Sequence, residues 1–348
     1  MTDTESPTLS KAPFRTGGIT FFSTQPYDKD FFIKHNADFG FNLEFVEAEL
    51  DENTVDLVKK SEAVCVFVND KVNRNVIECL AAKGVKIIAL RSAGFNNADL
   101  GAAKENGIKV CRVPAYSPEA VAEHAVAMIL TLNRKTHKAY NRVREQNFSL
   151  NGLLGFNLCG KTVGVVGTGN IGQAFCKIML GFGCKVLAFD LIANTEMEAL
   201  GAIYLPLTDL FNESDIISLH SPLTEQTHNL INGDTINMMK TGVMLINTSR
   251  GGLVDTRAVI TGLKSGKLGY VGIDVYEQEE KLFFRDLSGG IIKDDVIARL
   301  ISFSNVLITA HQGFFTGEAL DKIAEVTLSN INSILRNEDL RDNKGILV

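Results

Sequence analysis

A glycine-rich turn lies near the middle of the chain. It follows a strand-like run and precedes a helix-like segment, so the free N–H groups and positive dipole end of that helix would face an anion. In such a turn the first glycine lets the chain reverse, the second lets the backbone approach a pyrophosphate, and the third lets the helix pack against the strand. The pattern predicts a dinucleotide-binding site formed by Gly167, Thr168, Gly169, Asn170, Ile171 and Gly172.

The strand-like run 185–189 follows the turn and ends on Asp190. A carboxylate at the end of this second strand can accept hydrogen bonds from both hydroxyls of an adenosine ribose, and it would repel a 2′-phosphate. Residues 191–193 are Leu, Ile and Ala, so no Arg is present there to bind that phosphate. Asp190 therefore predicts NAD rather than NADP as the cofactor.

Three later strand-like runs end in residues that could handle a carboxylate and a proton. Arg250 follows the first run, Glu277 and Glu279 follow the second, and His311 follows the third. The carboxyl ends of parallel strands meet at one edge of a sheet, where ligands bind. The planar Arg fork matches a substrate carboxylate, and a His whose ring is oriented by a Glu can move a hydroxyl proton. These residues predict hydride transfer to or from a 2-hydroxy acid, and their spacing does not choose between the two acids.

Longer stretches of the chain resemble one family, the NAD-dependent D-isomer-specific 2-hydroxyacid dehydrogenases, and within it the fermentative D-lactate dehydrogenases. The resemblance covers nearly the whole chain from about Gly18 onwards. It is carried by RSAGFNN at 91–97, VPAYSPEAVAEH at 113–124, GTGNIG at 167–172, NTSRG at 247–251 and DVYE at 274–277.

The resemblance implies a role for each catalytic candidate. Arg250 would bind the substrate carboxylate, and His311 would be the acid–base. Glu279 rather than Glu277 would be the partner of His311, because the family's Glu is the second one after the Asp-x-Tyr strand end. The reaction implied is the stereospecific reduction of pyruvate to D-lactate, with a hydride from NADH.

Further contacts are expected around these residues. The resemblance implies that the Ala93 and Gly94 backbone and Tyr116 face the substrate and that Phe314 is a wall of its pocket. Many members of the family have Pro before the catalytic His and Thr after it, where this chain has Ala and Gln, which concerns the shape of the pocket. Cofactor contacts are also predicted for His220, Ser221, Pro222, Thr248, Ser249 and Asp274, the last near the nicotinamide amide.

The elements that position these residues form two series. In both, strand-like runs alternate with helix-like segments of three-to-four-residue apolar spacing, which predicts an α/β fold of two doubly wound parallel-sheet, Rossmann-like domains with the active site in the cleft between them. The first series has strands expected near 19–23, 44–48, 63–68, 85–90 and 109–113. The second has strands expected near 163–166, 185–189, 216–219, 243–247, 270–274 and 306–309.

A helix is expected between the two series. Ser117, Pro118 and Glu119 supply an N-cap, a first-turn Pro and a first-turn acid, and the amphipathic stretch then runs to about Glu145. This helix resembles the family's dimer arm, which implies a homodimer or a homotetramer. A last helix over 316–335 could return to the first series. The predicted domains are a flexible leader at 1–17, a discontinuous substrate domain at 18–115 plus 315–348, and an NAD-binding domain at 116–314.

Composition narrows the possible partners. The 348 residues are enough for two domains, and 45% hydrophobic with 22% charged residues is typical of a soluble globular protein. No apolar run reaches the length of a membrane helix, and residues 1–18 lack the apolar core of a secretory signal. A net charge of −6 argues against nucleic acid and anionic membranes. We expect a cytoplasmic enzyme that acts on a small molecule.

The remaining His and Cys residues carry weaker signals. His124 is predicted to be a packed, hydrogen-bonded residue of the long helix, whereas His35 and His137 are predicted to face solvent. The six cysteines show no CxxC pair and no His at metal-ligand spacing, which predicts reduced core thiols and no metal site.

Two other functions stay open at this point. A glycerate- or glyoxylate-type reductase would use the same residues on a different 2-keto acid. An NAD-binding corepressor that recruits protein partners would share the architecture, because fold alone does not decide function.

Overall fold

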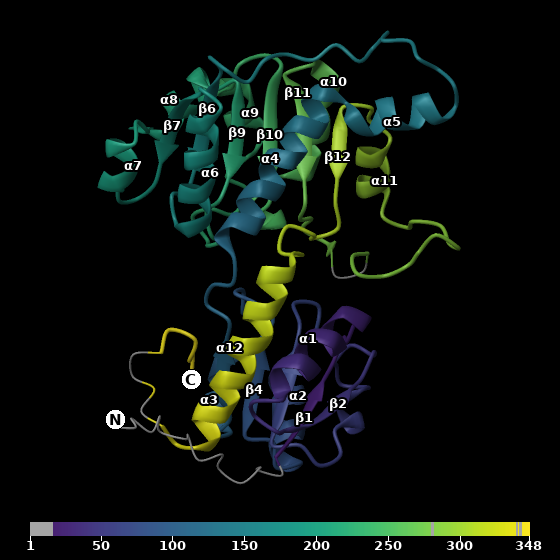
Figure 1. The fold of residues 1–348 in the computed structure, drawn as a ribbon, viewed down its shortest axis with the longest axis vertical. Helices are drawn as coiled ribbons and strands as arrows, with labels where there is room; N and C mark the ends of the chain where they lie inside the picture. Colours follow the sequence, from purple (N-terminus) through teal and green to yellow (C-terminus); the bar gives the residue numbers. More distant parts are fainter. Residues whose placement is uncertain (1–16, 280–281, 339, 341–342) are drawn as a thin grey trace, which may run out of the picture. The chain divides into compact units, whose positions relative to one another are not determined.

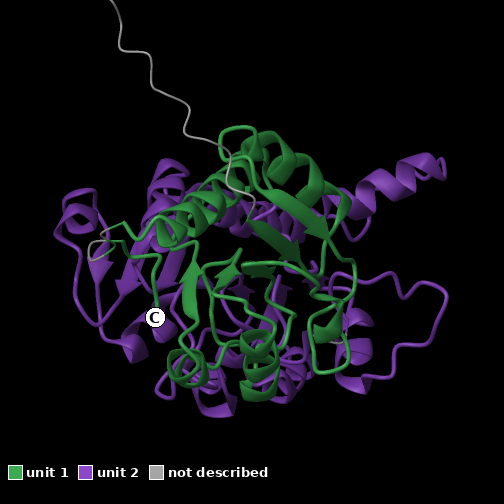
Figure 2. Cartoon of the chain, turned by 90° about the horizontal axis from the view of Figure 1, so that it is seen from below, with its two compact units in different colours: residues 1–116, 316–348 green, residues 117–315 purple. Residues whose placement is uncertain are grey.

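The computed structural model describes residues 17–279, 282–338, 340 and 343–348 (Figure 1). These residues form two compact units, one made of residues up to 116 together with 316–348, and the other of residues 117–315 (Figure 2). The chain leaves the first unit after Tyr116 and re-enters it at Thr316. The predicted flexible leader lies outside the described residues, apart from Gly17.

The first unit contains a five-stranded parallel sheet. Its strand order is β2-β1-β3-β4-β5, and β1, β3 and β4 are buried along their whole length, as parallel strands covered on both faces must be. The strands are β1 Gly18–Phe21, β2 Asn42–Phe45, β3 Ala63–Val66, β4 Ile87–Leu90 and β5 Lys109–Arg112. The second strand was expected at 44–48 and begins two residues earlier, at the less buried edge of the sheet.

Helices cover this sheet. They are α1 Pro26–Asn36, α2 Arg74–Ala82, α3 Leu100–Glu105 and α12 Gly317–Leu335, with the side chain of Thr316 capping α12. Although α12 comes last in the chain, it packs on β4, β5 and α1. The prediction that His35 faces solvent is wrong, because α12 places Asp321 Oδ1 2.9 Å from His35 Nε2.

The second unit contains a seven-stranded parallel sheet of order β12-β11-β10-β9-β6-β7-β8. Strand order reverses at β6, with β7 on one side and β9 on the other, so the carboxyl end of β6 is the switch point at which open parallel sheets bind ligands. The strands are β6 Thr162–Val166, β7 Lys185–Phe189, β8 Ile203–Tyr204, β9 Ile216–Leu219, β10 Val243–Asn247, β11 Leu268–Ile273 and β12 Val306–Ile308. The edge strand β8 was not predicted, because two residues are too few to show a period.

Alternate residues of these strands face two separate hydrophobic clusters. Along β10, Val243 and Leu245 belong to one cluster, whereas Met244 and Ile246 belong to the other. The helices packed around the sheet are α4 Pro118–Arg134, α6 Asn170–Gly181, α7 Thr195–Ala199, α8 Leu207–Glu213, α9 Gly233–Met238, α10 Thr256–Ser265 and α11 Asp295–Ile301, and α5 Thr136–Arg144 follows α4 without a buried residue.

The long connecting helix differs from its prediction. Ser117 caps its start as expected, accepting a hydrogen bond from the Ala120 N–H, but the helix ends at Arg134. Lys135 has a φ of 50°, the left-handed region, and α5 begins after it. The single helix expected to run to about Glu145 is therefore two helices, and only the first packs on α6, β10 and β11.

The described residues contain neither a membrane-spanning helix nor a cluster of metal ligands. No helix in these ranges has the length and apolar character needed to cross a membrane. No group of three or more His, Cys, Asp or Glu side chains there could hold a metal ion.

The expectation that all cysteines are core thiols is wrong for Cys79 and Cys159, which are exposed, whereas burial raises the pKa of the Cys65 thiol to about 12.

Candidate active site

The glycine turn joins β6 to α6 at this switch point in the strand order. Gly167 has a φ of 95°, and a Cβ there would lie 2.7 Å from backbone atoms of His220 and Ser221, so the loop after β9 packs directly on the turn. A Cβ on Gly172 would lie 2.0 Å from the Gly167 carbonyl oxygen. At Gly169, the N-cap residue of α6, a Cβ would meet nothing within 4 Å, and no side chain caps the helix. The first N–H groups of α6 are thus available to a phosphate.

Asp190 fixes the shape of this turn. Its Oδ2 accepts hydrogen bonds from the Thr168 N–H at 2.6 Å and the Thr168 hydroxyl at 3.0 Å, and its Oδ1 accepts one from the Leu191 N–H at 2.7 Å. The Tyr204 hydroxyl, on β8, donates to Thr168 Oγ1 at 2.8 Å. Each carboxylate oxygen of Asp190 can accept a further hydrogen bond. Leu191 and Ile192, which follow Asp190 in the chain, have exposed side chains. This corner suits an adenosine, whose ribose is polar and whose base is flat and apolar.

The loops after β9 and β10 lie against each other and carry two buried hydroxyls without partners. Ser249 Oγ donates to the Ser221 carbonyl at 2.6 Å, which joins the loops. The hydroxyls of Ser221 and Thr248 have no hydrogen-bond partner among the described residues. An unsatisfied buried hydroxyl costs about 1–3 kcal/mol, so a ligand that bonds to it removes that cost. Together with the open turn, these hydroxyls fit a bound dinucleotide.

His220, beside these hydroxyls, is held as a neutral ring. Its Nε2 lies 2.9 Å from Ser218 Oγ, and its ring centroid lies 4.8 Å from that of Phe175. Burial lowers the pKa of His220 to about 3, so the ring carries no charge at physiological pH. Pro222, which follows Ser221, is exposed.

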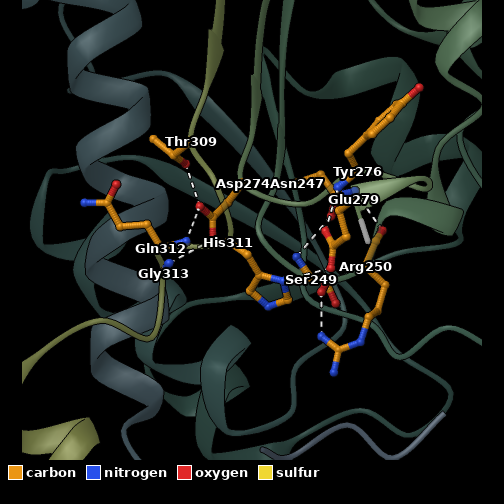
Figure 3. A network of polar contacts seen from close by, with 10 residues as sticks. All are labelled: Asn247, Ser249, Arg250, Asp274, Tyr276, Glu279, Thr309, His311, Gln312 and Gly313. Carbon is orange, nitrogen blue, oxygen red and sulfur yellow. Dashed lines mark hydrogen bonds and ion pairs between the residues drawn. The ribbon is translucent and has the colours of Figure 1, made fainter. Parts of the chain in front are cut away.

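His311 and Glu279 form a hydrogen-bonded pair at the ends of β12 and β11. The Nδ1 of His311 lies 2.9 Å from Oε1 of Glu279, and the other carboxylate oxygen accepts the Tyr276 N–H at 3.0 Å (Figure 3). A carboxylate only accepts, so Nδ1 donates, and Nε2 has no partner in the described part of the chain. Glu277 is exposed instead, with its Oε1 3.9 Å from Nε2 of His228.

Asp274 holds the loop that presents His311. Its carboxylate accepts hydrogen bonds from the Thr309 hydroxyl at 2.5 Å and from the N–H groups of Gln312 at 2.7 Å and Gly313 at 2.8 Å. Its backbone carbonyl accepts the His311 N–H at 2.7 Å. His311 has a φ of 52°, which costs a non-glycine residue about 1–2 kcal/mol and persists only where neighbours enforce it. Both carboxylate oxygens of Asp274 are therefore already engaged within the chain.

His124 joins this network from α4. Its Nε2 lies 3.1 Å from Thr309 Oγ1 and 3.3 Å from Asp274 Oδ1, so it is hydrogen-bonded, as predicted. Burial by itself would raise the pKa of the Asp274 carboxyl, but hydrogen bonds from His124 and Thr309 outweigh it and lower the pKa to about 2. Asp274 is therefore an anion at physiological pH.

Arg250 lies just after β10, and its guanidinium is not neutralised by any of the described residues. Its Nη1 donates to the Ser249 carbonyl at 2.7 Å, and Asn247, which is buried, donates to the Arg250 carbonyl at 2.9 Å. No carboxylate of the described residues pairs with Arg250. In Figure 3 the Arg250 side chain and the His311 ring extend towards the same side of the loops that carry them.

The residues predicted to face the substrate lie in both units. Ala93 and Gly94 follow β4 at the carboxyl edge of the first sheet, and Tyr116 is the last residue of that unit before α4. Phe314 belongs to the second unit, where its ring centroid lies 6.4 Å from that of His311 in an edge-on arrangement. Phe284, which was not predicted, lies 5.9 Å from the same ring.

Other residues of the site were also missed, although some carried a signal. Asn247 and Thr309 are polar residues at the ends of apolar strands, and such positions are unusual enough to mark a buried hydrogen-bonding role. Tyr204 lies on the short strand β8, and Phe284 lies where the sequence shows no regular period, so neither could be identified from pattern.

Comparison with known proteins agrees with this geometry. Residues 126–313 match the family model described as D-isomer specific 2-hydroxyacid dehydrogenase, NAD binding domain. The chain is 52% identical to the D-lactate dehydrogenase of Escherichia coli (strain K12), over 92% of this chain and 97% of that protein. The apo-structure of the E. coli D-lactate dehydrogenase matches with a TM-score of 0.87, covering 95% of this chain and 100% of that one, at 49% identity.

A structure with bound ligands is also similar. The D-lactate dehydrogenase of Aquifex aeolicus, complexed with NAD and lactic acid, matches with a TM-score of 0.82 at 37% identity, covering 94% of this chain and 98% of that one. The fold, together with the match to an NAD-binding family model, makes this chain an NAD-dependent oxidoreductase. This chain belongs to the D-isomer-specific 2-hydroxyacid dehydrogenase family. The fold of two parallel-sheet α/β domains, the family, the enzyme class and the cofactor predicted from the sequence are therefore confirmed.

Proposed function

We propose that the protein reduces pyruvate to D-lactate stereospecifically, with NADH as the reductant. The observation that carries this proposal is the pairing of His311 with Glu279 on the same sheet edge as an Arg250 that has no counter-charge among the described residues. The similarity to the E. coli D-lactate dehydrogenase supports pyruvate as the keto acid.

In the proposed reaction each side chain has a defined task. The guanidinium of Arg250 binds the substrate carboxylate through two parallel hydrogen bonds and polarises the adjacent carbonyl. His311 gives the proton on Nε2 to the carbonyl oxygen, while Nδ1 stays hydrogen-bonded to Glu279, whose charge stabilises the protonated ring. NADH, when bound along the glycine turn, supplies the hydride. Lactate oxidation reverses these steps, so the same ring then accepts the proton.

The remaining predicted contacts complete the proposal. The Ala93 and Gly94 backbone, Tyr116 and Phe314 would bound the substrate, and the nicotinamide amide would lie near Asp274. Because the carboxylate, the N–H and the carbonyl of Asp274 are all bonded within the chain, contact with the amide would use an oxygen lone pair that these bonds leave free. Thr248, Ser221 and Asp190 would bind the rest of the cofactor.

A panel of substrates tests the function directly. Purified protein is mixed with NADH and pyruvate, glyoxylate or hydroxypyruvate, and the nicotinamide absorbance is followed. We expect the highest kcat/KM with pyruvate, chirally pure D-lactate as product, and much slower reaction with NADPH because Asp190 repels its phosphate. Preference for glyoxylate or hydroxypyruvate would identify a different reductase, and NAD binding without turnover would favour a corepressor.

Glu279 is expected to act through His311. Changing Glu279→Gln removes the charge that stabilises the protonated ring, and we expect kcat/KM for pyruvate to fall roughly tenfold to a hundredfold, about 1.5–3 kcal/mol for a hydrogen bond to a charged group. The matched control is Glu277→Gln, two residues away and exposed, which should change kcat/KM less than twofold. A large loss in the control with none in Glu279→Gln would contradict the assignment.

We also propose that the protein is a homodimer or a homotetramer. α5 and the segment after it expose a group of large apolar side chains, which monomeric surfaces seldom cluster. The group consists of Tyr140, Val143, Phe148, Leu150 and Leu154. Sedimentation equilibrium should therefore give at least twice the mass of one chain, and a monomer at micromolar concentration would contradict this proposal.

A further inference from the structure

The turn after β4 presents free backbone donors at Ala93 and Gly94, whose backbone is proposed to bound the substrate. The N–H groups of Ala93, Gly94 and Phe95 have no hydrogen-bond acceptor among the described residues, and all three residues are partly buried. Free N–H groups at such a turn can bind an anion. Whether these N–H groups can reach an anion depends on the direction in which each peptide unit is held.

Arg112 holds one of these peptide units. It is the last residue of β5, and its Nη1 donates to the Ala93 carbonyl at 2.7 Å while its guanidinium lies 5.0 Å from the centroid of the Phe95 ring. The backbone of Arg112 is itself anchored, because its N–H donates to the Gly345 carbonyl at 2.7 Å and its carbonyl accepts from Asn330 Nδ2 at 3.0 Å. The side chain therefore extends from a rigid base.

The planarity of the peptide unit links the contact between Arg112 and the Ala93 carbonyl to the free Gly94 N–H. The Ala93 carbonyl and the Gly94 N–H belong to one peptide unit, and in a trans peptide these two groups point in opposite directions. Holding the carbonyl towards Arg112 therefore turns the Gly94 N–H away from Arg112. The hydrogen bond also polarises the peptide and strengthens its N–H as a donor.

The peptide needs this support because glycine restrains it poorly. Gly94 has access to backbone conformations that other residues lack, so the unit could rotate if nothing held it. Ser92 Oγ donates to the Gly94 carbonyl at 2.8 Å and holds the following peptide unit in the same way. The two side chains thus fix two successive peptide planes.

We propose that Arg112 is a positioning residue for the reaction, which holds the Ala93–Gly94 peptide so that its N–H faces the carboxylate of the 2-keto acid. This inference rests on the proposed function. Arg112 acts through the peptide and does not itself contact the reacting atoms.

Two substitutions test it. Arg112→Gln removes the charge and shortens the donor, whereas Arg112→Lys keeps the charge but cannot both donate to the Ala93 carbonyl and lie flat on the Phe95 ring. The measurements are KM and kcat for pyruvate, the Kd of the unreactive pyruvate analogue oxamate in the NADH complex, the Kd of NADH, and Tm. Arg74→Gln, which removes an exposed ion pair with Glu105 in the same unit, is the control.

We expect Arg112→Gln to raise the pyruvate KM and the oxamate Kd roughly tenfold to a hundredfold, the loss that matches one hydrogen bond to a charged group. Arg112→Lys should raise both about threefold or more on the same grounds. The NADH Kd should stay within about twofold in both variants, and the control should match the unmodified protein. If Arg112 had a merely structural role, the variants would lower Tm without weakening pyruvate and oxamate binding more than NADH binding.

The outcomes that would contradict the inference can be told apart from the outcome that would contradict the proposed function. If Arg112→Gln lowers Tm but leaves the pyruvate KM and the oxamate Kd unchanged, the inference is wrong and the proposed function stands. If Arg112→Gln does not fold, Arg112→Lys decides, and an unchanged pyruvate KM in that variant overturns the inference. If the unmodified protein reduces no 2-keto acid and binds no oxamate, the proposed function fails and the inference fails with it.

Discussion

Replacing Arg250 by Gln is expected to lower kcat/KM for pyruvate by roughly a hundredfold to several thousandfold. The substrate carboxylate would lose its bidentate partner, and breaking one side of a desolvated ion pair costs about 3–5 kcal/mol. Because no carboxylate of the described residues pairs with Arg250, its removal should not release a competing charge. Steady-state assays at the nicotinamide absorbance measure the loss, and the NADH Kd should change less than about twofold.

Arg257→Gln is the matched control. Arg257 is exposed on α10 of the same unit, and its removal should leave kcat/KM unchanged. If Arg250→Gln keeps kcat/KM within about tenfold of the unmodified protein, a difference of only about 1.4 kcal/mol, Arg250 does not bind the carboxylate.

Changing His311→Asn is expected to lower kcat by roughly a hundredfold to ten-thousandfold in both directions. General acid–base catalysis contributes a factor of this size, and an amide cannot give or take the proton. Asn is the suitable replacement because His311 has a φ of 52°, and Asn tolerates the left-handed region better than most residues. Pyruvate reduction and D-lactate oxidation should therefore fall together, with the NADH Kd retained.

His137→Asn serves as its control, since His137 is exposed on α5. A kcat within about tenfold of the unmodified value for His311→Asn would show that another group carries the proton.

Parts of the fold could be predicted because their signals are local. Strands β7, β9 and β10 have the same bounds as predicted from their apolar runs, because inner parallel strands are covered on both faces and are therefore largely apolar. The signal for the start of α4 was equally local, because it consists of a hydroxyl cap and a Pro in the first turn. The glycine turn falls between β6 and α6 as expected.

Other features depended on contacts that spacing does not encode. The break at Lys135 is a single left-handed residue in a continuous amphipathic pattern. His35 was predicted to face solvent because nothing near it in sequence indicated Asp321, which is 286 residues away. Periodicity reports which face of an element is apolar, and it carries no information on which polar side chains of distant elements meet.

By itself the sequence determined the chemistry available to this protein: a phosphate-binding turn, an acid for the ribose, and an Arg, a pair of acids and a His at successive strand ends. Spacing left Glu277 and Glu279 open, and only the resemblance to the family implied Glu279. The tertiary structure placed Glu279 against His311 and engaged the Asp274 carboxylate with the loop that carries His311. The physical reason is that residue type and spacing set what a side chain can do. Loop conformation sets which partner it meets within 3 Å, and that conformation is the sum of many weak contacts across the sheet edge.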